Sequence, residues 1–170
     1  MKKVINWSLH GMMLISKEEM YKILFHKGRM LLLDQAIIEG NIAIGKFVVP
    51  EGNYDDHSPL PNVPVMRGVE IIEAAFQLLA IMVARSSVFE TIYVGKTGIA
   101  RDIGKTTFYG FAKPGDELEL KTKTEVMVEE SMGILKIESG VITAYVKGKK
   151  KCVISSLTIM TFDPSKIKKQ

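Results

Sequence analysis

The chain has little cysteine and no long hydrophobic run, and both absences narrow its class. Cys152 is the single cysteine in 170 residues, so a disulfide framework within the chain is excluded. No run approaches the ~18 consecutive apolar residues that a membrane-spanning helix needs. The apolar N-terminal stretch is interrupted by polar residues, and no small-residue cleavage site follows it. These features predict a cytoplasmic protein that does not enter a membrane.

The sequence also lacks a large excess of charge of one sign. It carries 23 basic and 19 acidic side chains, for a net charge of +4. This excess is too small for a dedicated nucleic-acid-binding protein, but it suits an acidic partner or an anionic cofactor. Hydrophobic residues make up 46% of the chain, which is normal for one globular domain. We expect that domain over residues 16–170, after an N-terminal extension formed by residues 1–15.

Periodicity predicts one long helix and about six long strands. Residues 68–85 are apolar on nearly every side, which is typical of a buried helix. A shorter helix is expected to begin at Ser16, because Glu19 has capping-box spacing. Strands joined by short turns pair antiparallel and must cover their apolar face, so the pattern predicts an α+β protein with its sheet on the long helix. The runs with strand character are 30–38, 42–50, 91–100, 105–113, 117–128, 132–146 and 151–162.

A polar stripe marks the N-terminal half of the long helix. At 100° per residue, Glu70, Glu73 and Gln77 fall within about 60° of one another. A polar mouth leading onto an apolar wall would suit a polar headgroup followed by an acyl chain. The alternative, which periodicity alone favours, is a stripe that faces solvent. The apolar continuation of this face consists of Ala74, Ile81 and Ala84.

His57 begins a segment that resembles a known family. Of the three histidines, it alone precedes the long helix, the one element expected to position catalytic groups. Residues 57–77, H-S-P-L-P-N-V-P-V-M-R-G-V-E-I-I-E-A-A-F-Q, resemble the G-H-F-P-x-x-P-V-M-P-G-V and I-E-A-M-A-Q signature of bacterial 3-hydroxyacyl-[acyl-carrier-protein] dehydratases of the FabZ/FabA type. Residues 26–34, H-K-G-R-M-L-L-L-D, are similar to that family's H-R-Y-P-F-L-L-V-D, and residues 103–116 end in its P-G-D. The chain is identified as a divergent member. The resemblance implies the hotdog fold, a curved antiparallel sheet wrapped round one central helix.

The resemblance implies a role for each matching residue. His57 matches the base that takes the proton from C2 of the substrate, and Glu73 matches the acid that protonates the leaving 3-hydroxyl. The backbone N–H groups of Gly68 and Val69, at the helix N-terminus, would bind the thioester carbonyl. The other expected substrate contacts are Met66, Arg67, Gln77 and Phe108.

The same resemblance implies partners and a reaction. Members of the family work as dimers in which the histidine and the glutamate of one site come from different subunits. We therefore expect a homodimer, or a trimer of dimers, that acts on acyl thioesters carried by the phosphopantetheine of acyl carrier protein or by CoA. The expected reaction is dehydration of 3-hydroxyacyl thioesters to trans-2-enoyl thioesters, as in fatty acid biosynthesis. No metal or redox cofactor is expected, since the sequence shows no metal-ligand spacing.

Departures from the family pattern keep two other functions in view. Asp56 and Ser58 stand where the family has Gly and Phe, and two extra residues follow the histidine. Arg67 replaces a proline, although a cation is disfavoured at a helix N-terminus. One alternative is a hotdog thioesterase, which needs a carboxylate but not His57. The other is a non-catalytic subunit that binds acyl thioesters.

Overall fold

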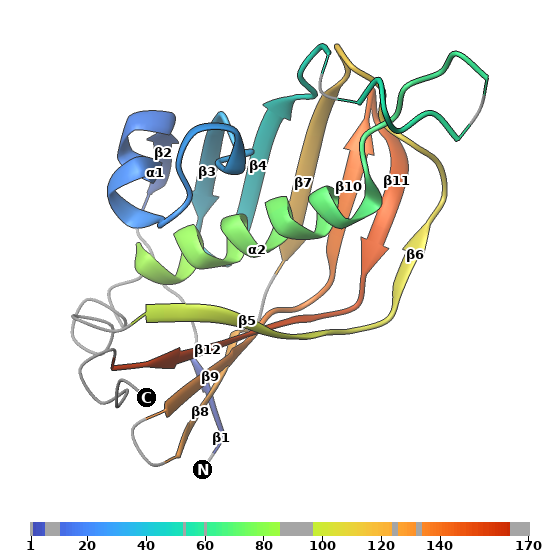
Figure 1. Cartoon of the computed structure of the whole chain (residues 1–170). Helices are drawn as coiled ribbons and strands as arrows, with labels where there is room; N and C mark the ends of the chain where they lie inside the picture. The colour runs from blue at the N-terminus through green and yellow to red at the C-terminus, as the bar shows by residue number, and fades with distance from the viewer. Residues whose placement is uncertain are drawn as a thin grey trace, which may run out of the picture.

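The computed structural model describes residues 2–5, 11–52, 54–59, 61–85, 97–123, 126–131 and 134–163 (Figure 1). Its helices are α1 (Lys17–Ile23), α2 (Gly68–Ala84) and the short 3-10 helix η1 (Gly28–Met30). Its first six strands are β1 (Lys2–Ile5), β2 (Met12–Ser16), β3 (Gln35–Glu39), β4 (Ile42–Val48), β5 (Thr97–Ile103) and β6 (Thr106–Phe108). The others are β7 (Glu117–Lys123), β8 (Val126–Ser131), β9 (Ile134–Glu138), β10 (Ile142–Val146), β11 (Lys149–Ile154) and β12 (Leu157–Phe162).

The strands form two antiparallel sheets, and the chain passes repeatedly from one sheet to the other. One sheet has the order β1-β8-β9-β12-β5 and the other the order β2-β3-β4-β7-β10-β11-β6. Strands consecutive in sequence, such as β5 and β6 or β11 and β12, lie one in each sheet, so the chain bends between them. At one bend Gly104 donates its backbone N–H to the Ser156 carbonyl at 2.8 Å, and a Cβ there would lie 2.9 Å from Ser156 N. The close approach of these two segments therefore requires a glycine.

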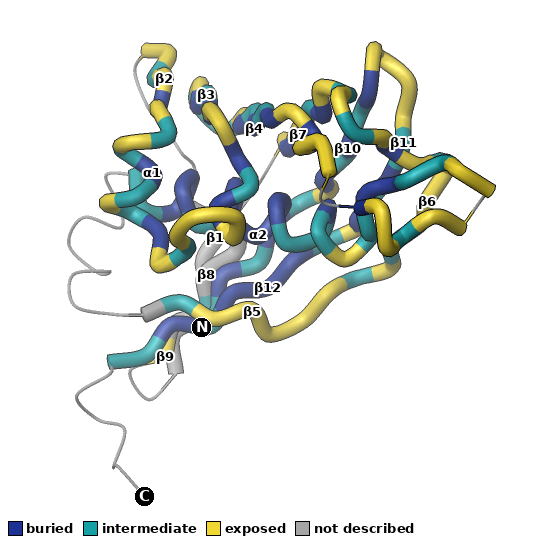
Figure 2. Tube along the Cα trace, turned by 45° about the horizontal axis from the view of Figure 1, so that its top comes forward, coloured by how far each residue is buried: buried dark blue, intermediate teal, exposed yellow. Residues whose placement is uncertain are grey.

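Helix α2 is the centre of the core. It packs against β3 and β4 of the larger sheet and β12 of the smaller one (Figure 1). Its tube is mostly buried, while most of β5 is exposed (Figure 2). A helix that is apolar nearly all round is stable only when other elements cover it, and the two sheets do so here. This arrangement confirms the α+β hotdog fold. The buried residues of α2 are Ile71, Ala74, Ala75, Phe76, Gln77, Leu78, Leu79, Ile81, Met82 and Val83.

The short helix α1 forms as its sequence predicts. Ser16 accepts a hydrogen bond from the Glu19 backbone N–H at 3.4 Å, and Glu19 Oε2 accepts one from the Ser16 backbone N–H at 2.9 Å. This reciprocal pair is the expected capping box. Burial of Met20 then fixes α1 against the core, which places the residues that follow α1 near α2.

The structure differs from the expected strands in three places. Residues 1–15, expected as an extension, contribute β1 and β2, each the edge strand of its sheet. The run 30–38 begins as a strand only at Gln35, because η1 and a loop precede it. The strands are also more numerous than six, since the runs 117–128, 132–146 and 151–162 each give two strands, one in each sheet. Residues 86–96, which include part of the expected strand 91–100, lie outside the described residues. No described helix is long and apolar enough to span a membrane.

Candidate active site

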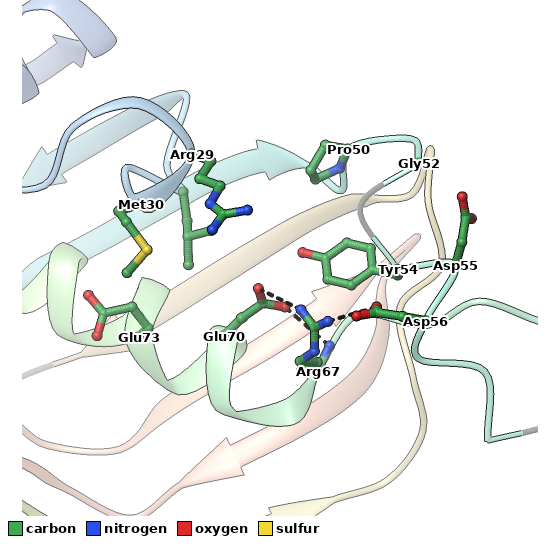
Figure 3. A pocket seen from close by; sticks show the side chains of 11 residues that line it. Arg29, Met30, Pro50, Gly52, Tyr54, Asp55, Asp56, Arg67, Glu70 and Glu73 are labelled. Atoms are coloured by element: carbon green, nitrogen blue, oxygen red, sulfur yellow. Dashed lines mark hydrogen bonds and ion pairs between the residues drawn. The ribbon is translucent and has the colours of Figure 1, made fainter.

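Charged side chains surround the N-terminus of α2 (Figure 3). The guanidinium of Arg67, the residue before the helix, lies 2.8 Å from Asp56 Oδ1 and 3.6 Å from Glu70 Oε1. The Arg67 backbone N–H also donates to Glu70 Oε2 at 3.3 Å. Two carboxylates therefore compensate for the cation that is otherwise disfavoured at the positive end of a helix dipole. Asp56 is paired with Arg67 across the loop.

The first turn of α2 is shaped by a close ring contact. A Cβ added at Gly68 would lie 2.8 Å from Cζ of Phe108, so the ring would have to move to accept any larger residue. The first N–H groups of a helix have no intrahelical acceptor, and those of Gly68 and Val69 are available to an oxygen of a bound molecule. The side chains of Phe108 and Val69 are largely exposed. The expected carbonyl-binding amides and Phe108 therefore lie together.

Glu73 is held by two side chains, one of which lies far away in the sequence. Its Oε1 lies 2.9 Å from Nε2 of His26, the third residue after α1. The same oxygen accepts a hydrogen bond from Gln77 Nε2 at 3.1 Å. The alternative interpretation of the stripe required Gln77 to face solvent, but its side chain is fully buried. It instead holds the Glu73 carboxyl group by one oxygen.

A polar cavity of about 610 Å³ lies beside the first half of α2. Its charged and polar lining includes Arg29, Tyr54, Arg67, Glu70 and Glu73 (Figure 3). Burial and the nearby Glu70 carboxyl group raise the pKa of Tyr54 to about 12. The phenol therefore remains protonated at neutral pH and can donate a hydrogen bond.

A second cavity, of about 540 Å³, is mainly apolar and runs along the second half of α2. Glu73 and His26 lie among its lining residues, so Glu73 belongs to both cavities. The expected wall is correct only for Ala84, because Ala74 and Ile81 point into the core with no exposed area. A helix winds past any straight face, and residues spaced differently along α2 line the cavity. The apolar side chains lining this cavity include Phe25, Phe76, Ala80, Ala84, Ile99 and Ile159.

His57 lies in the loop before α2, where backbone hydrogen bonds hold it. Its N–H donates to the Tyr54 carbonyl at 2.9 Å, and its carbonyl accepts from the Val65 N–H at 3.1 Å. Between them, Ser58 Oγ accepts from the Val63 N–H at 2.9 Å. The segment with two extra residues is therefore closed on itself, and His57 lies at its base. The His57 side chain is partly exposed.

The expected site residues do not all lie together in one chain. Among the hydrogen bonds and ion pairs of the described residues, none joins His57 to Glu73. Asp56, next to His57, lies beside Arg67 at the start of α2, with Glu73 farther along the helix (Figure 3). Met66 is buried in the core and is absent from the linings of both cavities.

Sequence reasoning missed two side chains of the site. The sequence interpretation assigned no catalytic role to His26, yet its side chain contacts Glu73. The motif in residues 26–34 was the available signal, because it contains Met30 and Leu32, whose backbone groups bind Gln77. Tyr54 gave no signal, since a lone tyrosine in a loop has no characteristic spacing. His10 lies outside the described residues, and no cluster of metal-ligating side chains occurs in the part of the chain that is described.

Comparison with curated proteins gives relatives along most of the chain. A 3-hydroxyacyl-[acyl-carrier-protein] dehydratase FabZ of Ligilactobacillus salivarius is 33% identical over 146 residues, which cover 84% of this chain and 95% of the relative. The FabZ of Thermoanaerobacter pseudethanolicus is 33% identical over 125 residues, covering 72% of this chain and 82% of the relative. No protein-family profile matches the chain.

Solved structures share the fold at low sequence identity. The dehydratase domain from the CurJ module of the curacin polyketide synthase has a TM-score of 0.64 and 16% identity, over 91% of this chain and 52% of that chain. A sigma28-regulated virulence protein of Campylobacter jejuni has a TM-score of 0.51 and 16% identity, over 88% of this chain and 89% of that chain. These likenesses support the fold alone.

Proposed function

Because the chain belongs to the FabZ family of 3-hydroxyacyl-[acyl-carrier-protein] dehydratases, we propose that it removes water from 3-hydroxyacyl thioesters and gives trans-2-enoyl thioesters. The observation that carries this proposal is the position of Glu73. Its carboxyl group borders both the polar cavity and the apolar cavity. A thioester headgroup and an acyl chain need such adjoining polar and apolar spaces, with the reacting carbon atoms between them.

In this proposal three groups divide the reaction. Neutral His57 takes a proton from C2, since histidine is the common base near neutral pH. The negative charge that develops on the thioester oxygen is stabilised by the backbone N–H of Gly68, with Val69 beside it at the helix N-terminus. Glu73 gives its proton to the 3-hydroxyl, and the C3–O bond breaks to release water. The double bond forms between C2 and C3, so atoms and charges balance.

The site is proposed to form between two copies of the chain. Within one chain Glu73 is engaged by His26 and Gln77, and we infer that the His57 of another copy completes the site. The segment that forms β5 and β6 is the edge of both sheets, and an edge strand presents unpaired N–H and C=O groups. Because Phe108 of β6 packs on Gly68, a second copy docked here would lie near α2. Exposed apolar side chains along or just beyond this edge are Ile99, Ile103, Phe108, Tyr109 and Phe111.

The substrate carrier is proposed to be acyl carrier protein, as in the names of the curated relatives. The net charge of +4 favours association with an acidic protein. Arg29 and Arg67 border the polar cavity and would lie near the phosphate of a phosphopantetheine arm. The reaction as written needs no metal or redox cofactor, and we place it in the cytoplasm with a homodimer as the working unit.

A direct assay tests the proposed reaction. The protein is incubated with 3-hydroxybutyryl thioesters of acyl carrier protein and of CoA, and the enoyl absorbance and the free thiol are followed together. We expect enoyl thioester to form without free thiol, and faster from the acyl carrier protein substrate. Release of thiol without an enoyl product would instead identify a thioesterase. Binding without either product would identify a non-catalytic acyl-binding subunit.

A further inference from the structure

The His26 side chain contacts the Glu73 carboxyl group but has no role in the proposed reaction. Its Nε2 lies 2.9 Å from Glu73 Oε1, and both side chains are about one-third exposed. His26 also borders the apolar cavity beside Glu73. The contact therefore lies where the acid must meet the substrate, within the same chain as the acid.

The second donor to this oxygen has a fixed orientation. Gln77 Oε1 accepts the Leu32 backbone N–H at 3.0 Å, and Gln77 Nε2 donates to the Met30 carbonyl at 2.7 Å. Because a backbone N–H can only donate and a carbonyl can only accept, the two ends of the amide cannot be exchanged. The remaining N–H of Gln77 therefore points to Glu73 Oε1, at 3.1 Å.

The histidine ring has a preferred tautomer for the same reason. His26 Nδ1 is buried and has no hydrogen-bond partner among the described residues. A proton on Nδ1 would be a buried donor without an acceptor, which is costly, whereas a proton on Nε2 finds the Glu73 carboxyl group. The neutral ring thus carries its proton on Nε2 and donates it to Oε1.

These contacts determine which oxygen of Glu73 can carry the acidic proton. Oε1 accepts from both His26 and Gln77, so its lone pairs are occupied. We propose that His26 is a positioning residue, which together with Gln77 holds Oε1 so that the acidic proton is on Oε2 and is presented to the 3-hydroxyl. This inference rests on the proposed function and adds a residue that acts through Glu73 without touching the reacting atoms.

Kinetics of two His26 variants test the inference. His26→Phe keeps a ring but removes the donor, whereas His26→Gln keeps an N–H at a similar reach. We expect His26→Phe to lower kcat about 10-fold with KM within about 2-fold, a smaller loss than the ~10²-fold expected from removing the acid itself. His26→Gln should recover most of kcat. The control Lys27→Met removes a hydrogen bond from the same segment to the Tyr21 carbonyl without touching Glu73, and kcat should remain near that of the wild type.

Two kinetic outcomes would overturn the inference. One is wild-type kcat in His26→Phe. The other is equal loss in His26→Gln and His26→Phe, which would indicate that the ring supports the fold and does not act as a donor. A rise in KM with unchanged kcat would count against positioning as well, because it would place His26 in substrate binding.

A spectroscopic measurement separates this inference from the proposed function. Nitrogen-15 NMR of the imidazole rings, with His26 assigned from the spectrum of His26→Phe, should show the tautomer protonated on Nε2. The Nε2 signal should move in Glu73→Gln. If the wild-type protein forms no enoyl product but the ring shows this pattern, the proposed reaction fails and the geometry stands. A ring protonated on Nδ1, or a signal that ignores Glu73→Gln, would refute the positioning role whatever the activity.

Discussion

The two halves of α2 offer a bound molecule opposite surroundings. The first half borders a cavity whose lining carries the ion pairs of Arg67 with Asp56 and Glu70. The second half borders a cavity lined by small and aromatic apolar side chains such as Ala80 and Phe76. One helix thus presents a charged environment and an apolar one, and Glu73 lies where they meet.

The difference shows how a buried helix can carry the polar groups of a candidate site. The core requires most of α2 to be apolar, and the burial of Leu78, Ile81 and Met82 meets that requirement. The polar groups are confined to one side near the N-terminus, where each finds a partner. Burial of a polar group is costly unless it is hydrogen-bonded, and Gln77 meets this condition with three hydrogen bonds. Substitutions in each half should therefore affect different steps.

Removal of either proposed acid–base residue should have the largest effect, because each would transfer a proton in the proposed reaction. We expect Glu73→Gln and His57→Ala each to lower kcat at least ~10²-fold, the lower end for a general acid or base. Enoyl formation from 3-hydroxyacyl thioester is the measurement, with circular dichroism to confirm folding. Near-normal turnover in both variants would defeat the assignment.

Crowding at the first turn of α2 should have the next largest effect. Gly68→Ala places a Cβ within 3 Å of the Phe108 ring, so the ring or the helix N-terminus must shift. A displacement of about 1 Å in a binding group can cost ~10²-fold in rate, and we expect a loss of kcat of about 10-fold to 10²-fold. In a Phe108→Ala background the same substitution should cost much less. Equal losses in both backgrounds would show that the ring contact is not the cause.

Filling the apolar cavity should change chain-length preference. Ala80→Phe adds a ring where the acyl chain is proposed to lie. If it excludes two methylene groups, the loss is about 1.6 kcal/mol, or ~10-fold in kcat/KM for long chains, with little change for the 3-hydroxybutyryl substrate. Kinetics on a series of chain lengths measures this. The same proportional loss for all lengths would place the acyl chain elsewhere.

Removal of the Arg67 charge at the start of α2 should have the smallest effect on turnover. Arg67→Met removes the guanidinium proposed to lie near the substrate phosphate, together with its ion pairs to Asp56 and Glu70. A partly exposed ion pair contributes about 0.2–1 kcal/mol. We expect KM for the acyl carrier protein substrate to rise by about 2-fold to 5-fold with kcat nearly unchanged. Lys121→Met, which breaks an ion pair with Glu119 on the sheet surface, is the matched control. An unchanged KM in Arg67→Met would remove this residue from substrate binding.

Much of the fold is predictable from periodicity. The helix at 68–85 stands out because it is apolar on nearly all sides, and the alternation in β7 matches the burial of Leu118, Leu120 and Thr122. The strands in residues 1–15 were missed because they are short edge strands, whose pairing depends on distant partners such as β3 and β8. Periodicity within a segment contains no information about which strand it will join.

The candidate site is less predictable than the fold. The stripe on α2 gives Glu73 and Gln77, since a helix brings residues four apart together. The contact of His26 with Glu73 depends instead on the path of the chain between α1 and β3. Two hydrogen bonds between the Gln77 side chain and the backbone of Met30 and Leu32 determine that path. The ion pair between Arg67 and Asp56 likewise depends on how the loop returns to the helix. Contacts across long stretches of chain leave no periodic signal.

The central claim is that His57 and Glu73 of one site belong to different chains, and mixing two inactive variants tests it most directly. In a mixed dimer of His57→Ala with Glu73→Gln, one of the two sites would contain both native residues and the other would contain neither. After unfolding and refolding of an equal mixture, half of the dimers would be mixed, and we predict about a quarter of the wild-type activity from a two-fold symmetric dimer. No recovery in a mixture shown by mass spectrometry to contain mixed dimers would contradict the claim.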